Sequence, residues 1–195
     1  PIRLYANDGD TLMLSWSSIE NEFSTGLAWA DWDGDGDLDL AQSNWGQANR
    51  VYDNRNDSLY PVWTAPDADA SNGLAWGDWD NDGDLDLATA NEYEPVRLYA
   101  NPARLNLHPV SFYNADSNAL AWGDWDGDGD LDLAEANGTI DDPQPNHVYR
   151  NDDGQLVAAW TSAESDISNE VAWGDWDGDG DLDLAVANGD STLGQ

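Results

Sequence analysis

The chain has 195 residues, of which 40 are Asp or Glu and six are basic, giving a formal net charge of −34 at pH 7. This charge argues against nucleic acid and anionic membrane surfaces as partners, because their phosphates would be repelled. The absence of cysteine excludes disulfides and zinc–thiolate sites. No apolar run reaches the ~18 residues of a membrane span, but 40% apolar residues and twelve tryptophans are enough for a folded core.

The chain begins at Pro1 rather than at a methionine, from which we expect a processed or trimmed product. Its first segments, Ile2–Tyr5 and Thr11–Trp16, are predicted to be strands separated by turn residues of the Asn-Asp-Gly type. No stretch of the chain shows a sustained helical period, so an all-β fold is expected.

The next feature is the nonapeptide Asp31-Trp32-Asp33-Gly34-Asp35-Gly36-Asp37-Leu38-Asp39, which places five carboxylates at alternate positions. Like charges at this density repel one another, and a divalent cation removes the difficulty. Carboxylates at the first, third and fifth positions with glycine at the sixth match the start of a calcium loop. A helical EF-hand is excluded, because its twelfth position would be Glu rather than Gln42 and helices would flank the loop. The competing interpretation is an acidic turn kept soluble by its charge.

The acidic loop occurs four times, and other residues recur in step with it. The loops begin at Asp31, Asp78, Asp124 and Asp175. A Tyr-x-Asn marker recurs at Tyr5, Tyr52, Tyr99 and Tyr149. Each loop is also preceded by one serine and followed by one asparagine in register: Ser24, Ser71, Ser117 and Ser168, then Asn44, Asn91, Asn137 and Asn188. We therefore expect a single domain, 1–195, built from repeat units of approximately 1–49, 50–94, 95–145 and 146–195.

Each unit contains four segments predicted to be strands. In the second unit, Leu74–Trp79 leads into the acidic loop, Leu85–Ala90 leaves it and Arg97–Tyr99 follows. The fourth segment is clearest at Gln155–Trp160. Four strands in a period of this length is the size of a propeller blade, and apolar residues on both faces suit a blade held between neighbours. The sequence predicts a β-propeller of four four-stranded blades, with one calcium loop in each blade.

The two ends of the chain supply complementary halves of one unit. The N-terminus supplies a third and a fourth strand, whereas Val171–Ala187 supplies a first and a second. We expect these halves to pair and to close the ring within one chain. A slice of a longer tandem array would have the same pattern, so self-association into a dimer or a tandem array is the alternative.

The segment Leu-Ala-Trp-Gly-Asp-Trp-Asp-Gly-Asp-Gly-Asp-Leu-Asp-Leu-Ala at 120–134 resembles the core of FG-GAP and VCBS repeats, which occur in integrin α-subunit propellers and microbial surface proteins. The resemblance covers nearly the whole chain and implies four structural Ca²⁺ ions, each bound between a blade's first and second strands. In the first loop the implied ligands are the side chains of Asp31, Asp33, Asp35 and Asp39 and the backbone carbonyl of Asp37. The equivalent residues of the other loops are Asp78, Asp80, Asp82, Asp84 and Asp86; Asp124, Asp126, Asp128, Asp130 and Asp132; and Asp175, Asp177, Asp179, Asp181 and Asp183. The familiar propellers of this family have seven blades, from which four would be a departure.

The aromatic residues divide into two groups. Eleven tryptophans keep the repeat register and are expected to pack between blades: Trp16, Trp29, Trp32, Trp63, Trp76, Trp79, Trp122, Trp125, Trp160, Trp173 and Trp176. The aromatic residues outside the register are better candidates for a recognition surface: Trp45, Tyr60, Tyr93, Phe112 and Tyr113.

No catalytic constellation is readable. Arg3, Arg50 and Arg97 precede the repeat tyrosine and are expected to pair with carboxylates, while His108 and His147 form no evident nucleophile–base pair. A carboxylate pair for glycoside cleavage stays open, because forty acids would hide it. Asn56 and Asn137 fit the glycosylation pattern, which often arises by chance.

These observations and the resemblance lead us to expect an extracellular calcium-binding module for adhesion or recognition. Calcium would stiffen the fold, and one face would bind a glycan or a protein. The alternatives are a polysaccharide lyase or hydrolase on a propeller scaffold, and a structural subunit of a surface array or filament.

Overall fold

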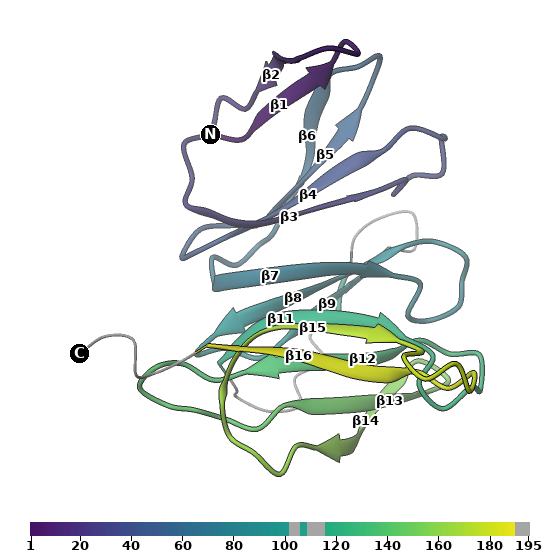
Figure 1. The fold of residues 1–195 in the computed structure, drawn as a ribbon. Coiled ribbons are helices and arrows are strands. Elements are labelled where there is room, and N and C mark those ends of the chain that lie inside the picture. Colours follow the sequence, from purple (N-terminus) through teal and green to yellow (C-terminus); the bar gives the residue numbers. More distant parts are fainter. Residues whose placement is uncertain (102–105, 109–115, 190–195) are drawn as a thin grey trace.

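The computed structural model describes residues 1–101, 106–108 and 116–189. Within those residues the chain forms sixteen strands in antiparallel sheets and no helix (Figure 1). The all-β prediction is therefore confirmed. Among the described residues, no helix is present that could cross a membrane. Phe112 and Tyr113 lie outside the described residues.

Three sheets are complete and have four strands each, in chain order. Two further sheets have only two strands each and come from the ends of the chain. The complete sheets are β3 (Ser24–Ala30), β4 (Asp39–Asn44), β5 (Arg50–Asn54) and β6 (Leu59–Thr64); β7 (Ala70–Gly77), β8 (Asp86–Glu92), β9 (Arg97–Ala100) and β10 (Asn106–His108); and β11 (Ser117–Gly123), β12 (Asp132–Asn137), β13 (His147–Asp152) and β14 (Gln155–Thr161). The two-stranded sheets are β1 (Arg3–Asn7) with β2 (Leu12–Ser17), and β15 (Ile167–Gly174) with β16 (Asp183–Gly189).

The sequence repeat reappears as a repeat of strand register. The second and third strands of the complete sheets place a leucine opposite the repeat tyrosine, as in Leu40 opposite Tyr52 and Leu87 opposite Tyr99. The repeat serine lies opposite the repeat asparagine, and Ser71 Oγ donates a hydrogen bond to Asn91 Oδ1 at 2.6 Å. The repeat serine and asparagine thus pair at the end of the sheet that is remote from the acidic loop.

The first strand of the second unit begins and ends earlier than the sequence predicts, at Ala70 and Gly77. The expected strand Leu74–Trp79 ends in the structure at Gly77, so that Asp78 and Trp79 already belong to the loop. The reason is local: the Trp79 backbone N–H donates to the side-chain oxygen Asp86 Oδ2 at 2.9 Å rather than to a backbone carbonyl of β8, so the ladder ends where Gly77 lies opposite Asp86.

Successive sheets stack on one another through the registered aromatic residues. The ring of Trp63 meets Tyr99 of the next sheet edge-on at 5.0 Å between centroids, and Trp16 meets Tyr52 at 5.6 Å. The Trp173 Nε1 donates across to the Ala121 carbonyl at 3.1 Å. The predicted role in packing between blades is confirmed for Trp16, Trp63 and Trp173, whereas Trp29 and Trp176 are 46% and 83% exposed. The array of sheets is propeller-like.

The expected closure of the ring within one chain is not found. Among the described strands, β1 and β2 form one sheet and β15 and β16 form another, and the two sheets lie at opposite ends of the array (Figure 1). The physical reason is that each terminal pair packs on its own neighbour. At the N-terminal end, Ile2, Leu4 and Trp16 pack against Leu40 and Tyr52. There, Leu184 and Val186 pack against the cluster that contains Ala134 and Val148.

The close approach of the innermost strands can be tested at Gly73. A Cβ placed on Gly73 would lie 2.8 Å from the backbone carbonyl oxygen of Asn118 in the next sheet, whereas a Cβ on Gly174 would meet nothing within 4 Å. We expect Gly73→Ala to lower the free energy of unfolding by about 1–3 kcal/mol, because the backbone must shift. The matched control, Gly174→Ala, should be nearly neutral. Equal denaturant midpoints for the two variants would contradict this packing.

Candidate metal centres

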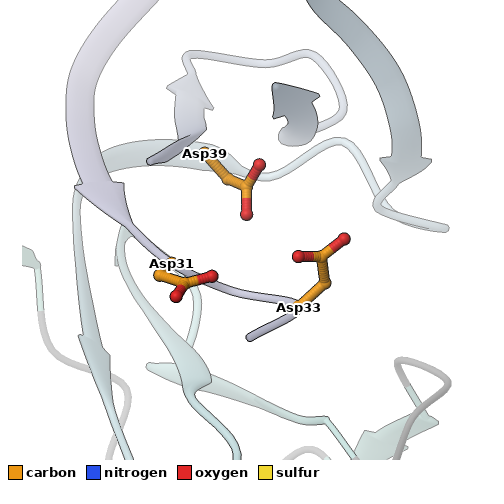
Figure 2. A group of neighbouring side chains, drawn as sticks. All are labelled: Asp31, Asp33 and Asp39. Atoms are coloured by element: carbon orange, nitrogen blue, oxygen red, sulfur yellow. The ribbon is translucent and has the colours of Figure 1, made fainter. Parts of the chain in front are cut away.

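The first acidic loop joins β3 to β4 and gathers three carboxylates around one point. Asp31, Asp33 and Asp39 each offer an oxygen, and these oxygens lie within 4.8 Å of one another. Figure 2 shows the three side chains facing a shared space. Gly34 and Gly36 have φ values of 75° and 95°, which residues with a Cβ rarely adopt. The sixth position is glycine with a positive φ in all four loops, whereas Asn81 adopts a φ of 56° at the fourth position of the second loop.

Backbone amides of the loop fix the carboxylates in place. Asp33 Oδ1 accepts from the Asp35 N–H at 3.2 Å, and Asp35 Oδ1 accepts from the Asp37 N–H at 3.0 Å. Asp31 Oδ2 accepts from the Gly36 N–H at 3.1 Å. These bonds hold one oxygen of each carboxylate and leave the other free to bind a cation, which is the arrangement of a preformed metal loop.

The last aspartate of the loop is the most constrained. Asp86 is fully buried, with Oδ2 accepting from the Trp79 N–H at 2.9 Å and Oδ1 accepting from the Asn101 N–H at 2.7 Å. Asp39 and Asp132 accept the equivalent pairs of bonds. Burial raises the pKa of all three carboxyls, and that of Asp86 rises to about 6. A nearby cation would favour the charged form of these carboxyls.

The aspartate at the first position of each of the first three loops shows whether a cation fits the site. Asp31 Oδ1, Asp78 Oδ1 and Asp124 Oδ1 are buried without a hydrogen-bond partner. A buried carboxylate oxygen without a partner costs free energy, and a hard cation among the neighbouring carboxylates removes that cost. An all-oxygen donor set of this kind suits Ca²⁺. The residues therefore fit the metal.

The structure brings together some of the predicted ligands in each loop and leaves others apart. The four groups that can hold a metal ion are Asp31, Asp33 and Asp39; Asp78, Asp80 and Asp82; Asp124, Asp126 and Asp132; and Asp175, Asp177 and Asp183. The aspartates at the seventh position, such as Asp37 and Asp84, belong to none of these groups. In the third loop, Asp130 Oδ1 accepts from Asn81 Nδ2 at 2.7 Å and Asp130 Oδ2 accepts from the Asp153 N–H at 3.1 Å. A seventh-position side chain that bonds elsewhere is compatible with metal binding through its backbone carbonyl.

The asparagine of the Tyr-x-Asn marker supports the metal loops, a role that the sequence did not reveal. The Asn101 N–H bonds to Asp86 of its own sheet, and Asn101 Nδ2 donates to the Trp32 carbonyl in the loop of the preceding sheet at 3.2 Å. Asn151 makes the equivalent pair of contacts, to Asp132 and to the Trp79 carbonyl. Each asparagine therefore links two neighbouring loops. The only available signal was its strict register with the loop.

The fourth loop has the same turn but lacks this support. Asp183 Oδ2 accepts from the Trp176 N–H at 3.0 Å, as in the other loops. No bond to its Oδ1 from a third strand is found among the described residues, because β16 is an edge strand there. Trp176 is 83% exposed, whereas the equivalent Trp79 is buried. The fourth site is thus the least enclosed of the four.

The arginines and the second glycosylation pattern have structural roles. Arg50 pairs with Glu22 at 2.7 Å, and Arg97 pairs with Asp67 at 3.4 Å and more closely with Asp69. The predicted pairing with carboxylates is confirmed for these two. Asn137 is fully buried and its Nδ2 donates to the Pro145 carbonyl at 3.0 Å, so it is not accessible to glycosylation in the folded chain.

Comparison with known families decides the family of this chain. The FG-GAP-like repeat model matches three times, over residues 31–89, 78–135 and 136–186. The chain belongs to the FG-GAP-like repeat family. The resemblance seen in the acidic loops is therefore confirmed, and FG-GAP repeats explain both the strand order and the four aspartate groups. No curated protein matches the chain.

The raised pKa of Asp86 predicts opposite effects of acid on the two forms of this FG-GAP protein. In the metal-free form the folded state holds the proton more tightly than the unfolded state does, so stability is lost as pH rises through about 6. We expect the chelated protein to melt at a higher temperature at pH 5 than at pH 7. The calcium-loaded protein should behave in the opposite way, because protons compete with the metal. Melting curves at both pH values, with calcium and with chelator, check that the two forms respond to pH in opposite directions.

Proposed function

We propose that this protein is an extracellular recognition module in which four Ca²⁺ ions hold the FG-GAP loops and an aromatic surface binds carbohydrate. The sites would be completed by the carboxylates of positions one, three, five and nine and the backbone carbonyl of position seven in each loop. The four aspartate groups support the calcium part of this proposal. Extracellular calcium modules bind with Kd values of about 10⁻⁴–10⁻³ M, which suits loops as open as the fourth.

The observation that carries the recognition part is an aromatic cluster around Glu92. Trp45 Nε1 donates to Glu92 Oε2 at 2.9 Å, and the Trp45 ring packs edge-on against Phe23 with 6.1 Å between centroids. A hydrogen bond to Glu92 also raises the pKa of Tyr93. Phe23, Trp45 and Tyr93 are all largely exposed. We call these four residues the Glu92 surface.

The chemistry of the Glu92 surface suits sugars. Aromatic rings provide flat apolar contact area at a small entropic cost, and a carboxylate beside them accepts hydrogen bonds from hydroxyl groups. The surface is fixed by the backbone, because the Tyr93 N–H donates to Asp116 Oδ1 at 3.0 Å and Tyr93 has a φ of 63°. The surrounding protein is strongly acidic, which disfavours anionic glycans. A neutral glycan is therefore the favoured ligand.

A glycan array with and without calcium tests this proposal. We expect binding of neutral glycans in calcium and its loss in chelator, since the loops hold the sheets that carry the surface. Trp45→Ala and Tyr93→Ala should each weaken binding about tenfold or more, corresponding to ~1.4 kcal/mol, with little change in melting temperature. Tyr60→Ala, which removes a half-exposed tyrosine of β6, is the control. Absence of glycan binding in calcium, or an equal loss of binding in the Tyr60 variant, would contradict the proposal.

A further inference from the structure

We propose that the β1–β2 hairpin of a second copy of this chain docks on the free edge of β16, inserts Tyr5 into an aromatic pocket and completes the fourth blade. This inference goes beyond the proposed sugar binding and does not depend on the Glu92 surface. It rests on three features of the described residues: two complementary strand edges, one pocket, and one incomplete metal loop.

The two free edges match the register that the chain already uses. In the complete sheets, the second strand pairs with the third so that Ala41 lies opposite Val51 and Ala88 lies opposite Leu98. The equivalent residues at the ends are Ala185 in β16 and Leu4 in β1. The same register would place Leu184 opposite Tyr5. Both edges are unpaired among the described strands, and an unpaired edge is a template for another strand.

The pocket beside β16 has the composition of an aromatic site that is filled elsewhere in the chain. Its volume is about 220 Å³. Among the residues that line it are Trp125, Val148, Trp160, Trp173 and Leu184. Two repeats earlier in the chain, the equivalent residues pack around Tyr99. They are Trp32, Val51, Trp63, Trp76 and Leu87. The repeat register therefore assigns the pocket to the next repeat tyrosine, which is Tyr5.

The exposure of the repeat tyrosines agrees with this assignment. Tyr52, Tyr99 and Tyr149 are 0–2% exposed, whereas Tyr5 is 48% exposed. Trp160 lines the pocket and is 42% exposed, although the equivalent Trp63 packs its ring against Tyr99. Tyr5 and Trp160 are thus two halves of a contact that the chain forms elsewhere, at Trp16 with Tyr52 and at Trp63 with Tyr99.

Docking would also complete the fourth metal loop. In the other three loops the last aspartate accepts a bond at Oδ1 from the N–H of Asn54, Asn101 or Asn151. The equivalent residue for Asp183 is Asn7, at the end of β1. A second copy would therefore contribute a backbone donor to the fourth site, and calcium binding and association should support each other.

The positions of the two terminal sheets favour pairing of β16 with the hairpin of a second copy over pairing with the hairpin of the same chain. The β1–β2 sheet packs on β4 and β5 at one end of the array, and β15–β16 packs on the sheet of β11–β14 at the other end (Figure 1). The three complete sheets lie between these two terminal sheets, which therefore do not meet within one chain. Pairing between copies keeps the contacts of both terminal sheets with their neighbours. It also repeats the pairing of second and third strands that is present in the complete sheets. Such a contact is head-to-tail, so it produces a two-chain ring or a longer assembly.

Cross-linking tests the register directly, because the natural chain has no cysteine. We would mix the single variants Leu4→Cys and Ala185→Cys in calcium under mild oxidation. The expected product is a disulfide-linked species of twice 21.3 kDa. Leu184→Cys mixed with Leu4→Cys is the control, because adjacent residues of a strand point to opposite faces. Absence of the linked species from the mixture, or equal linking in the Leu184→Cys control, would overturn the proposal.

A second measurement distinguishes association through the pocket from nonspecific association. Sedimentation over a range of protein concentrations should show association in calcium that Tyr5→Ala abolishes and Tyr60→Ala does not. Tyr5 is half exposed in the structure, so its removal should leave the melting temperature of the dissociated chain nearly unchanged. A monomer at all concentrations in calcium, or equal association of the Tyr5 variant, would refute the docking of Tyr5.

Discussion

Excess chelator at neutral pH is expected to unfold the protein or to lower its melting temperature by tens of degrees. A site saturated at 100 times its Kd contributes about 2.7 kcal/mol, so four independent sites would contribute roughly 11 kcal/mol. An ordinary domain has a total stability of about 5–15 kcal/mol. Chelation would also leave the unpartnered oxygens of Asp31, Asp78 and Asp124 buried next to other carboxylates.

Differential scanning calorimetry in calcium, in magnesium and in chelator measures this effect. Magnesium should protect less, because it demands a smaller octahedral site and dehydrates reluctantly. A titration of the chelated protein with calcium should restore the melting temperature. A melting curve that stays unchanged in chelator would show that the loops fold without metal.

Asp86→Ala is expected to have the largest effect of any single substitution in the loops. The variant loses a proposed metal ligand and leaves the backbone N–H groups of Trp79 and Asn101 without their acceptor, the fully buried Asp86 carboxylate. Each buried donor without a partner costs about 1–3 kcal/mol, so we expect a loss of roughly 2–6 kcal/mol. The bound calcium should fall by one ion per chain.

Asp84→Ala is the matched control, because Asp84 is exposed whereas Asp86 is buried, and neither residue belongs to the converging group of Asp78, Asp80 and Asp82. If the seventh position binds metal through its backbone carbonyl, this variant should keep its full calcium content and melt within a few degrees of the natural protein. Calcium content by elemental analysis and melting curves check both variants. Loss of one ion from the Asp84 variant would assign the side chain of the seventh position to the metal.

Local features of this protein could be predicted from the sequence because short-range chemistry fixes them. The acidic loop predicts its own turn, since the carboxylates of Asp33 and Asp35 accept hydrogen bonds from amides two residues ahead and Gly36 provides the positive φ. The all-β class and the strand order follow from a repeat in which every segment is too short for a helix. The sheet register was found only in the structure, where leucine and tyrosine at fixed positions of each unit lie opposite each other.

The tertiary structure decided what depends on contacts between units. That Asn101 supports two loops could not be read from the sequence, because its partners Asp86 and Trp32 are 15 and 69 residues away. The sequence predicts that the two terminal half-units match but not whether they meet. Whether they meet depends on the angle at which each sheet packs on the next. Side chains such as Trp63 and Tyr99 pack between the sheets, and their combined effect on the angle is a long-range property that a local sequence pattern does not show.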